Sequence, residues 1–256
     1  MAAVWSRRSF AASLVAGAAA GLTTALRSRP AAADTPRVLL LGDSMIKGAV
    51  GRFLENELED THGWSVVRQG KTSSGLSRPD YYDWISEGAK ARKAGAPFDG
   101  VVTMFGGNDA QGLYKLKADR DNENDKWIRY GEAGWDDEYR RRINAFADAV
   151  TADGEHLFWI GMPVMGPSRL HDRMAELNVI YRGEMAVRPK AEFIDIWRTL
   201  ADNQGNYSDH AGHGDNKRRI RAHDGIHLNG NGAMLVVREV VPVMQKHLAG
   251  KAVAAE

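Results

Sequence analysis

The sequence of 256 residues contains no cysteine, which excludes disulfide bonds, thiolate metal sites and a cysteine nucleophile. It also lacks a strong charge bias, with 34 lysine and arginine residues against 33 aspartate and glutamate residues. Four of the arginines lie in the first 33 residues, which contain no acid, so the remainder carries 30 basic and 33 acidic side chains. This slightly negative remainder gives no reason to expect nucleic acid as a partner.

No apolar run reaches the ~20 residues that a membrane-spanning helix needs. The weakly apolar stretch at residues 11–26 follows SRRSF at residues 6–10, which resembles the twin-arginine export motif. Ala31 and Ala33 suit cleavage by a signal peptidase before Asp34. We therefore expect a signal peptide at residues 1–33, a single domain at residues 34–256, and a periplasmic or secreted bacterial protein that is not inserted in the membrane after cleavage. An uncleaved membrane anchor is the alternative, and the oligomeric state stays open.

From Pro36 onward, short apolar runs alternate with amphipathic stretches, which is typical of βα units around a parallel sheet. This pattern predicts an α/β fold, a three-layer α/β/α sandwich with a five-stranded parallel sheet, whose ligands bind at the carboxyl ends of the strands. Pro242 should kink or break the last helix. We predict strands at 37–41, 64–67, 100–105, 157–161 and 193–196, helices at 46–58, 135–150, 170–185 and 233–248, and loops at 115–134 and 202–221.

Ser44 directly follows the first predicted strand in the string LLLGDSM, where a strand ends and a helix begins. Its own amide and the helix N-terminus can stabilise a negative charge that develops there. A serine at this place can equally be a helix cap, so it needs partners to indicate catalysis.

Asp224 and His227 supply such partners in the string DGIHLN, shortly before the last predicted helix. In one short turn, an imidazole can act as the base toward Ser44 while the carboxylate fixes its tautomer. A capping aspartate beside a surface histidine is the alternative interpretation.

Two further motifs follow strands on the same expected edge. In FGGND, Gly106 and Gly107 allow close backbone approach, and Asn108 offers a side-chain amide to an oxyanion. In QGKTSSG, Gly70 or Gly75 can offer a backbone amide.

These blocks together resemble the SGNH/GDSL hydrolase superfamily, with GDSM, GKTS, GGND and DGIH in order between positions 38 and 232. The string GKTSSGLSRPDYYDW with GGNDAQGL is similar to an exported bacterial subgroup catalogued as a domain of unknown function. The resemblance implies a flavodoxin-like fold, a triad of Ser44, His227 and Asp224, and an oxyanion hole formed by Ser44, Gly70 and Asn108. It also implies an acyl transfer that needs neither a metal nor another cofactor.

Other patterns compete with this interpretation. Ser44 and Lys47 form SxxK, the nucleophile motif of penicillin-binding proteins, but the accompanying SDN and KTG strings are absent, as is the GxSxG elbow of α/β-hydrolases. The segment SDHAGHGD could hold a metal, although a hydrophilic loop is favoured, and the basic string after it is favoured as a solvated loop. The residues concerned are Asp209, His210, His213 and Asp215, then Lys217, Arg218, Arg219 and Arg221, with His223 four positions before His227.

Six aromatic residues lie in or near the loops after the second and third predicted strands, where rings could stack on sugars or simply pack. Together with the motifs and the resemblance above, this leads us to expect a serine esterase that removes a small acyl group, such as acetyl, from a cell-envelope glycan or similar alcohol. An O-acyltransferase with the same triad and a glycan-binding protein without turnover are the alternatives. The six residues are Tyr81, Tyr82, Trp84, Tyr114, Trp127 and Tyr130.

Overall fold

A five-stranded parallel sheet forms the centre of the computed structural model, which describes residues 35–212 and 214–248. Its strand order is β2-β1-β3-β6-β7, so the predicted α/β fold class and five-stranded parallel sheet are confirmed. The expected signal peptide at residues 1–33 lies outside the described residues. The strands are β1 (Arg37–Gly42), β2 (Ser65–Gly70), β3 (Gly100–Met104), β6 (His156–Ile160) and β7 (Ala191–Ile194).

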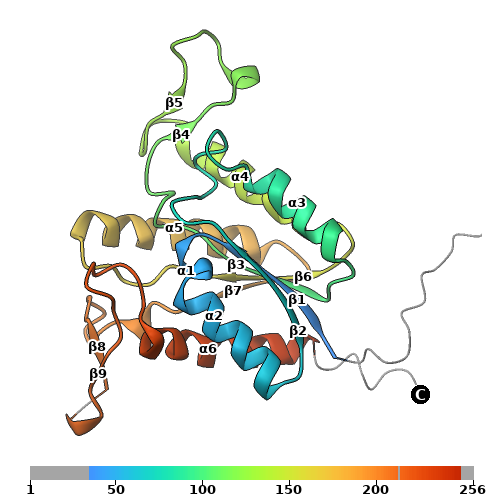
Figure 1. Ribbon diagram of the computed structural model, residues 1–256. Helices are drawn as coiled ribbons and strands as arrows, with labels where there is room; N and C mark the ends of the chain where they lie inside the picture. Colours follow the sequence, from blue (N-terminus) through green and yellow to red (C-terminus); the bar gives the residue numbers. More distant parts are fainter. Residues whose placement is uncertain (1–34, 213, 249–256) are drawn as a thin grey trace, which may run out of the picture. The chain divides into compact units, whose positions relative to one another are not determined.

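Helices cover both faces of this sheet, which makes the three layers visible in Figure 1. The helices α2 (Ala49–Asn56) and α6 (Gly230–Leu248) pack together on one face. The helices α3 (Trp84–Gly95), α4 (Trp135–Val150) and α5 (Ser168–Ala186) lie on the other face. Right-handed crossovers explain this division, because the chain moves from β1 to β2 in one direction and from β2 to β7 in the other.

The reversal of direction lies between β1 and β3, and in folds of this type ligands bind at the carboxyl ends of the strands at that point. Ser44 follows β1 and Asn108 follows β3, so both lie at this edge.

The remaining elements are short: α1 (Ser44–Lys47), η1 (Glu57–Thr61), η2 (Lys117–Asp119), η3 (Arg198–Leu200), η4 (Gly214–Asn216), the hairpin of β4 (Leu113–Tyr114) and β5 (Trp127–Ile128), and the hairpin of β8 (His210–Ala211) and β9 (Arg218–Arg219).

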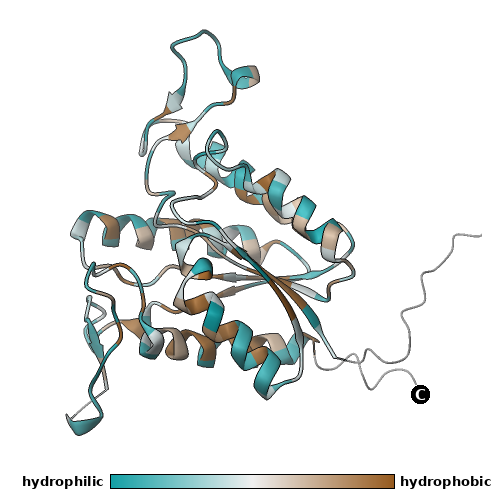
Figure 2. Ribbon diagram, viewed as in Figure 1, coloured by the Kyte–Doolittle hydropathy of each residue, from teal (hydrophilic) through white to brown (hydrophobic). Residues whose placement is uncertain are grey.

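The hydrophobic core lies on both sides of the inner strands, whose side chains are almost all buried. Figure 2 shows these strands as hydrophobic, whereas the two hairpins are largely hydrophilic. The continuous apolar runs of β1 and β3 made them recognisable in the sequence, because strands covered on both faces do not alternate. No helix among the described residues is long and apolar enough to cross a membrane.

Three helices differ from the predictions. The predicted helix at residues 46–58 begins earlier, at Ser44, and is divided at Gly48 into α1 and α2. The sequence prediction missed α3, because its buried face is sparse and packs through Gly88 closely against Val150. Of the kink or break expected at Pro242, the break is wrong, since α6 continues through Pro242 from Gly230 to Leu248.

Candidate active site

Ser44 is the first residue of α1 and is half-buried at the end of β1. The carboxylate of Asp43 accepts a hydrogen bond of 2.8 Å from the Met45 amide, which caps the helix at this point. The sharp transition from strand to helix therefore orients the hydroxyl of Ser44 at the edge where α1 begins.

The segment that contains Asp224 and His227 is a tight turn closed by backbone hydrogen bonds. The amide of Ala222 donates to the carbonyl of His227 at 2.8 Å, and Gly225 adopts φ +67°, a left-handed conformation that favours glycine. One carboxylate oxygen of Asp224 accepts the amides of Ile226 and His227, each at 2.9 Å. The backbone of the turn thus fixes the position of the carboxylate independently of its contact with the imidazole.

Arg221 anchors this turn to the body of the protein, contrary to the prediction that it belongs to a solvated basic loop. Its side chain is 1% exposed and donates to the carbonyls of Val164 and Ile226 at 2.7 and 3.2 Å. Burial lowers the pKa of Arg221 to about 10. Buried arginine is rare unless its donors are paired, and here carbonyls accept from both terminal nitrogens of the guanidinium, whereas Nε is buried without a partner.

The hydroxyl of Ser44 and the turn meet across 183 positions of sequence. Nε2 of His227 lies 2.8 Å from Oγ of Ser44, and Nδ1 of His227 lies 2.6 Å from Oδ2 of Asp224. An ionised carboxylate only accepts, so Nδ1–H donates to Asp224 and Nε2 remains to accept the serine proton. The three residues therefore form one unbroken hydrogen-bonded chain.

Asp224 remains charged in this arrangement. Partial burial raises its pKa, but hydrogen bonds from the His227 ring and from the amides of Ile226 and His227 outweigh that effect and lower the pKa to about 2. A negative charge at Asp224 stabilises a developing imidazolium at His227.

Gly70 ends β2 directly opposite Gly42 of β1. A Cβ atom at position 70 would lie 2.4 Å from the backbone nitrogen of Lys47, so only glycine permits this close approach to α1. A Cβ atom at Gly75 would instead lie 2.2 Å from Oδ1 of Asp109. The structure thus brings Gly70 beside the helix that begins at Ser44, whereas Gly75 borders a buried carboxylate.

Asn108 lies in the loop after β3 and is half-buried. Its backbone carbonyl accepts the Ser77 hydroxyl at 3.1 Å, and its side chain lies close enough to Asp43 to lower the pKa of that carboxyl. A side-chain amide has two N–H donors, so a contact with Asp43 leaves one donor for another partner. Asp43 therefore couples the loop that carries Asn108 to the turn that carries Ser44.

Asp43 and Asp109 are a buried pair of carboxylates that the sequence prediction missed. Both are at most 1% exposed, and Asp109 accepts the Ser77 amide at 2.7 Å and the Tyr139 hydroxyl at 2.8 Å. Burial raises the pKa of Asp43 to about 7, hydrogen bonds partly oppose the rise, and the charge of Asp109 adds to it. Burial also raises the pKa of Asp109. An acid at a helix cap directly after a buried strand is the sequence signal for Asp43.

The raised pKa of Asp43 predicts a stability that falls with pH. The folded protein keeps this proton up to about pH 7, whereas the unfolded chain loses it near pH 4, so stabilisation present below pH 4 is lost as the pH rises to about 7. The loss amounts to about 4 kcal/mol at most. Asp43→Asn removes this contribution, so we expect the unfolding free energy of the variant, relative to wild type, to increase between about pH 4 and pH 7.

Urea unfolding at several pH values tests this expectation. Asp83→Asn is the matched control, because Asp83 caps α3 by accepting the Ile85 amide but is only half-buried. A free-energy difference between Asp43→Asn and wild type that does not change with pH would contradict the assignment.

Neither the SxxK motif nor the segment considered for a metal shows a hydrogen-bonded chain like that of Ser44, His227 and Asp224 among the described residues. Lys47 is exposed, and the hydrogen-bond partner of the Ser44 hydroxyl is His227. In the segment considered for a metal, Nδ1 of His210 pairs with Asp209 at 2.7 Å, while His213 lies outside the described residues. Among the described residues, the group suited to a metal lies elsewhere.

Most of the aromatic side chains singled out in the sequence are committed to packing. Trp84 is buried in the core, Trp127 and Tyr114 pack against each other and against Arg78, and Tyr130 lies under Arg173. Tyr82 accepts a hydrogen bond from Gln69. Two of the six are exposed, Tyr81 at 49% and Trp127 at 43%. The ring of Tyr81 lies 5.4 Å from the ammonium of Lys71, the residue after Gly70.

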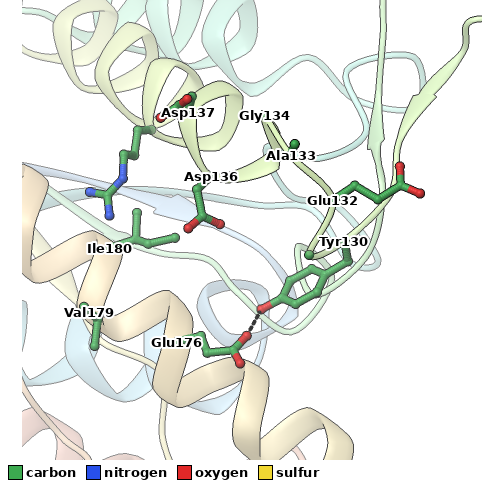
Figure 3. A pocket seen from close by; sticks show the side chains of 11 residues that line it. Tyr130, Glu132, Ala133, Gly134, Asp136, Asp137, Glu176, Val179 and Ile180 are labelled. Atoms are coloured by element: carbon green, nitrogen blue, oxygen red, sulfur yellow. Dashed lines mark hydrogen bonds between the residues drawn. The ribbon is translucent and has the colours of Figure 1, made fainter.

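A cavity of about 580 Å³ lies between the start of α4 and the middle of α5 (Figure 3). Tyr130 donates a hydrogen bond of 2.6 Å to Glu176 at its wall. The lining includes Glu132, Asp136 and Asp137 but neither Ser44 nor His227. It is therefore separate from the candidate active site.

The fold and the order of these motifs define the class to which the protein is similar. A carbohydrate esterase of family 3 from Talaromyces cellulolyticus superposes with a TM-score of 0.55 at 14% identity, covering 84% of this chain and 99% of that one. A GDSL-like lipase from Bacteroides thetaiotaomicron gives 0.53 at 17% identity, over 82% and 88% of the chains. A lipolytic G-D-S-L protein from Veillonella parvula gives 0.54 at 15% identity, over 82% and 98%. The predicted relationship to the SGNH/GDSL hydrolases is thereby confirmed at the level of the fold.

The amino-acid sequence of this chain also matches a protein family. Residues 37–243 match the family described as a protein of unknown function, DUF459, and the chain belongs to it. Comparison with curated proteins finds no match.

Proposed function

We propose that the protein is a serine esterase that removes small acyl groups, such as acetyl, from the hydroxyl groups of a glycan or similar alcohol. The observation that carries this proposal is the hydrogen-bonded chain from Ser44 through His227 to Asp224. Its geometry matches that of a nucleophile, a general base and the carboxylate that orients the base.

In the proposed reaction, Nε2 of His227 takes the proton of Ser44 as Oγ attacks the ester carbonyl. The tetrahedral oxyanion rests on the amides of Ser44 and Gly70 and on the side chain of Asn108. The imidazolium then protonates the leaving alcohol, and an acyl-enzyme remains. Water, deprotonated by His227, attacks this ester and releases the acid, which restores the free serine.

The alcohol part of the substrate is the less defined half. Tyr81 and Lys71 support a sugar at this place, because an exposed ring can stack on a pyranose and Lys71 directly follows Gly70. The twin-arginine-like sequence supports an exported enzyme acting on cell-envelope material. The similar fold of a carbohydrate esterase is compatible with this substrate class.

The proposed oxyanion hole predicts a defined loss for Asn108→Ala. Removing one oxyanion donor costs on the order of 10²-fold to 10³-fold in kcat, with a smaller change in KM. Initial rates on p-nitrophenyl acetate measure both constants. Asn124→Ala, in the β4–β5 loop, is the control, because it removes an exposed asparagine that lies outside the four motifs. Equal kcat in wild type and Asn108→Ala would contradict the role of this amide.

Acyl length and acceptor are tested directly with defined esters. We expect p-nitrophenyl acetate to be hydrolysed faster than the butyrate and octanoate esters, and acetylated xylan or a similar O-acetylated glycan to release acetate. Hydrolysis of long-chain esters alone would indicate a lipid substrate instead. Acyl transfer to added oligosaccharide in place of acetate release would identify an O-acyltransferase.

A further inference from the structure

Two histidines and one glutamate meet at the edge of the sheet opposite the candidate active site. They are His156 at the start of β6, Glu192 in β7 and His247 in the last turn of α6. All three are half-buried, and one donor atom from each lies within 4.8 Å of the other two. Nε2 of His247 is 3.1 Å from Oε1 of Glu192, and the two imidazole rings have centroids 4.4 Å apart.

The sheet register explains why these side chains converge. Phe158 of β6 is paired with Glu192 of β7, and His156 lies two residues before Phe158, so all three point to the same face. The face is the one that α6 covers, since α6 contacts both strands. The ring of His156 also stacks on Phe158 with centroids 4.7 Å apart, which limits its rotation. Three donors are thus held by three elements of regular structure.

We propose that His156, Glu192 and His247 bind one divalent transition-metal ion of the Zn²⁺ type. Two imidazoles and one carboxylate are a known donor set for Zn²⁺, with water available as the fourth ligand. Zn²⁺ bonds of about 2.0–2.2 Å in a tetrahedron require donor atoms about 3.3 Å apart, so small side-chain rotations from the present spacing suffice. Glu192 supplies a negative charge to the cation, and neutral imidazoles supply the remaining bonds.

The position of this site separates the ion from the candidate active site. The α6 helix begins at Gly230, three residues after His227, and reaches His247 after 17 further residues, or about 26 Å of helix. The ion would therefore connect the far end of α6 to β6 and β7, and the helix that follows the catalytic turn would be held at both ends. The proposal does not depend on the esterase reaction.

Titration calorimetry of the untagged, chelator-treated full chain with ZnCl₂ or CoCl₂ tests the proposal. We expect one ion per chain, and a loss of affinity of at least tenfold in both His247→Ala and His156→Ala. At a Zn²⁺ concentration of about 100 Kd, the Tm should rise by about 5–10 °C in wild type and not in these variants. Glu192→Gln, which keeps side-chain size, provides a third variant if an alanine variant does not fold.

His210→Ala is the matched control, because His210 also pairs with a carboxylate, Asp209, at 2.7 Å but does not belong to the group suited to a metal among the described residues. This variant should bind Zn²⁺ as wild type does. The proposal is overturned if wild type shows no binding in the calorimeter, if His247→Ala binds as tightly as wild type, or if His210→Ala is the variant that loses the ion.

Discussion

Ser44→Ala is expected to lower kcat/KM for p-nitrophenyl acetate by on the order of 10⁴-fold to 10⁶-fold, because the proposed mechanism forms the acyl-enzyme on the hydroxyl of Ser44. The fold should be unaffected, since Asp43 rather than Ser44 caps α1 through the Met45 amide. Rates of nitrophenol release and urea unfolding curves measure the two effects separately.

Ser168→Ala is the control for this variant. Ser168 is likewise the first residue of a helix, α5, that follows a strand at the same edge of the sheet, and it is exposed. Its replacement should leave kcat/KM within about twofold of wild type. Full activity of Ser44→Ala would contradict the proposed mechanism, even if the urea unfolding curve of the variant were the same as that of wild type.

His227→Ala is expected to lower kcat by a factor similar to that of Ser44→Ala, on the order of 10⁴-fold or more. Without the imidazole, nothing at 2.8 Å from Oγ accepts the serine proton. The two residues act as one unit, so the double variant should be no worse than either single variant. Multiplication of the two losses in the double variant would show that the residues act independently.

His210→Ala serves as the matched control a second time. Both histidines hydrogen-bond through Nδ1 to an aspartate, at 2.6 Å in His227 and 2.7 Å in His210, and both are similarly exposed. Only His227 also contacts the hydroxyl of Ser44. A loss in His227→Ala that is matched by His210→Ala would therefore point to a general effect of removing a surface histidine.

The sequence was sufficient to predict the sheet and the residues that meet at its edge, for two physical reasons. Inner strands such as β1 and β3 are buried on both faces, so their sequences are continuous apolar runs. Asp224 and His227 lie in one turn, so their contact is local and depends little on the rest of the chain. The meeting of this turn with Ser44 then followed from the order of the strands.

Other features were not accessible because they depend on tertiary contacts. Arg221 stands in a basic string, and only the surrounding carbonyls of Val164, Leu200 and Ile226 show that it is buried. The helix α3 has a weak apolar pattern because it packs through a glycine. The sequence signals for the start of α3 are Asp83 as the N-cap and Glu87 in the first turn.

The pair of Asp43 and Asp109 illustrates a further limit. Both belong to the motifs GDSM and GGND, yet the motif pattern assigns roles only to their neighbours Ser44 and Asn108. Asp109 reaches Ser77 and Tyr139, which are 32 and 30 positions away, and Asp43 reaches the Asn108 loop. The residues beside the proposed catalytic groups therefore connect three loops that the sequence presents as separate blocks.

Labelling with a fluorophosphonate, followed by peptide mapping in a mass spectrometer, tests the central claim most directly. The account predicts one adduct on the wild-type chain, located at Ser44, absent from Ser44→Ala and formed at least 100-fold more slowly in His227→Ala. An adduct at another serine, or equal labelling of wild type and His227→Ala, would contradict the assignment of Ser44 as a nucleophile activated by His227.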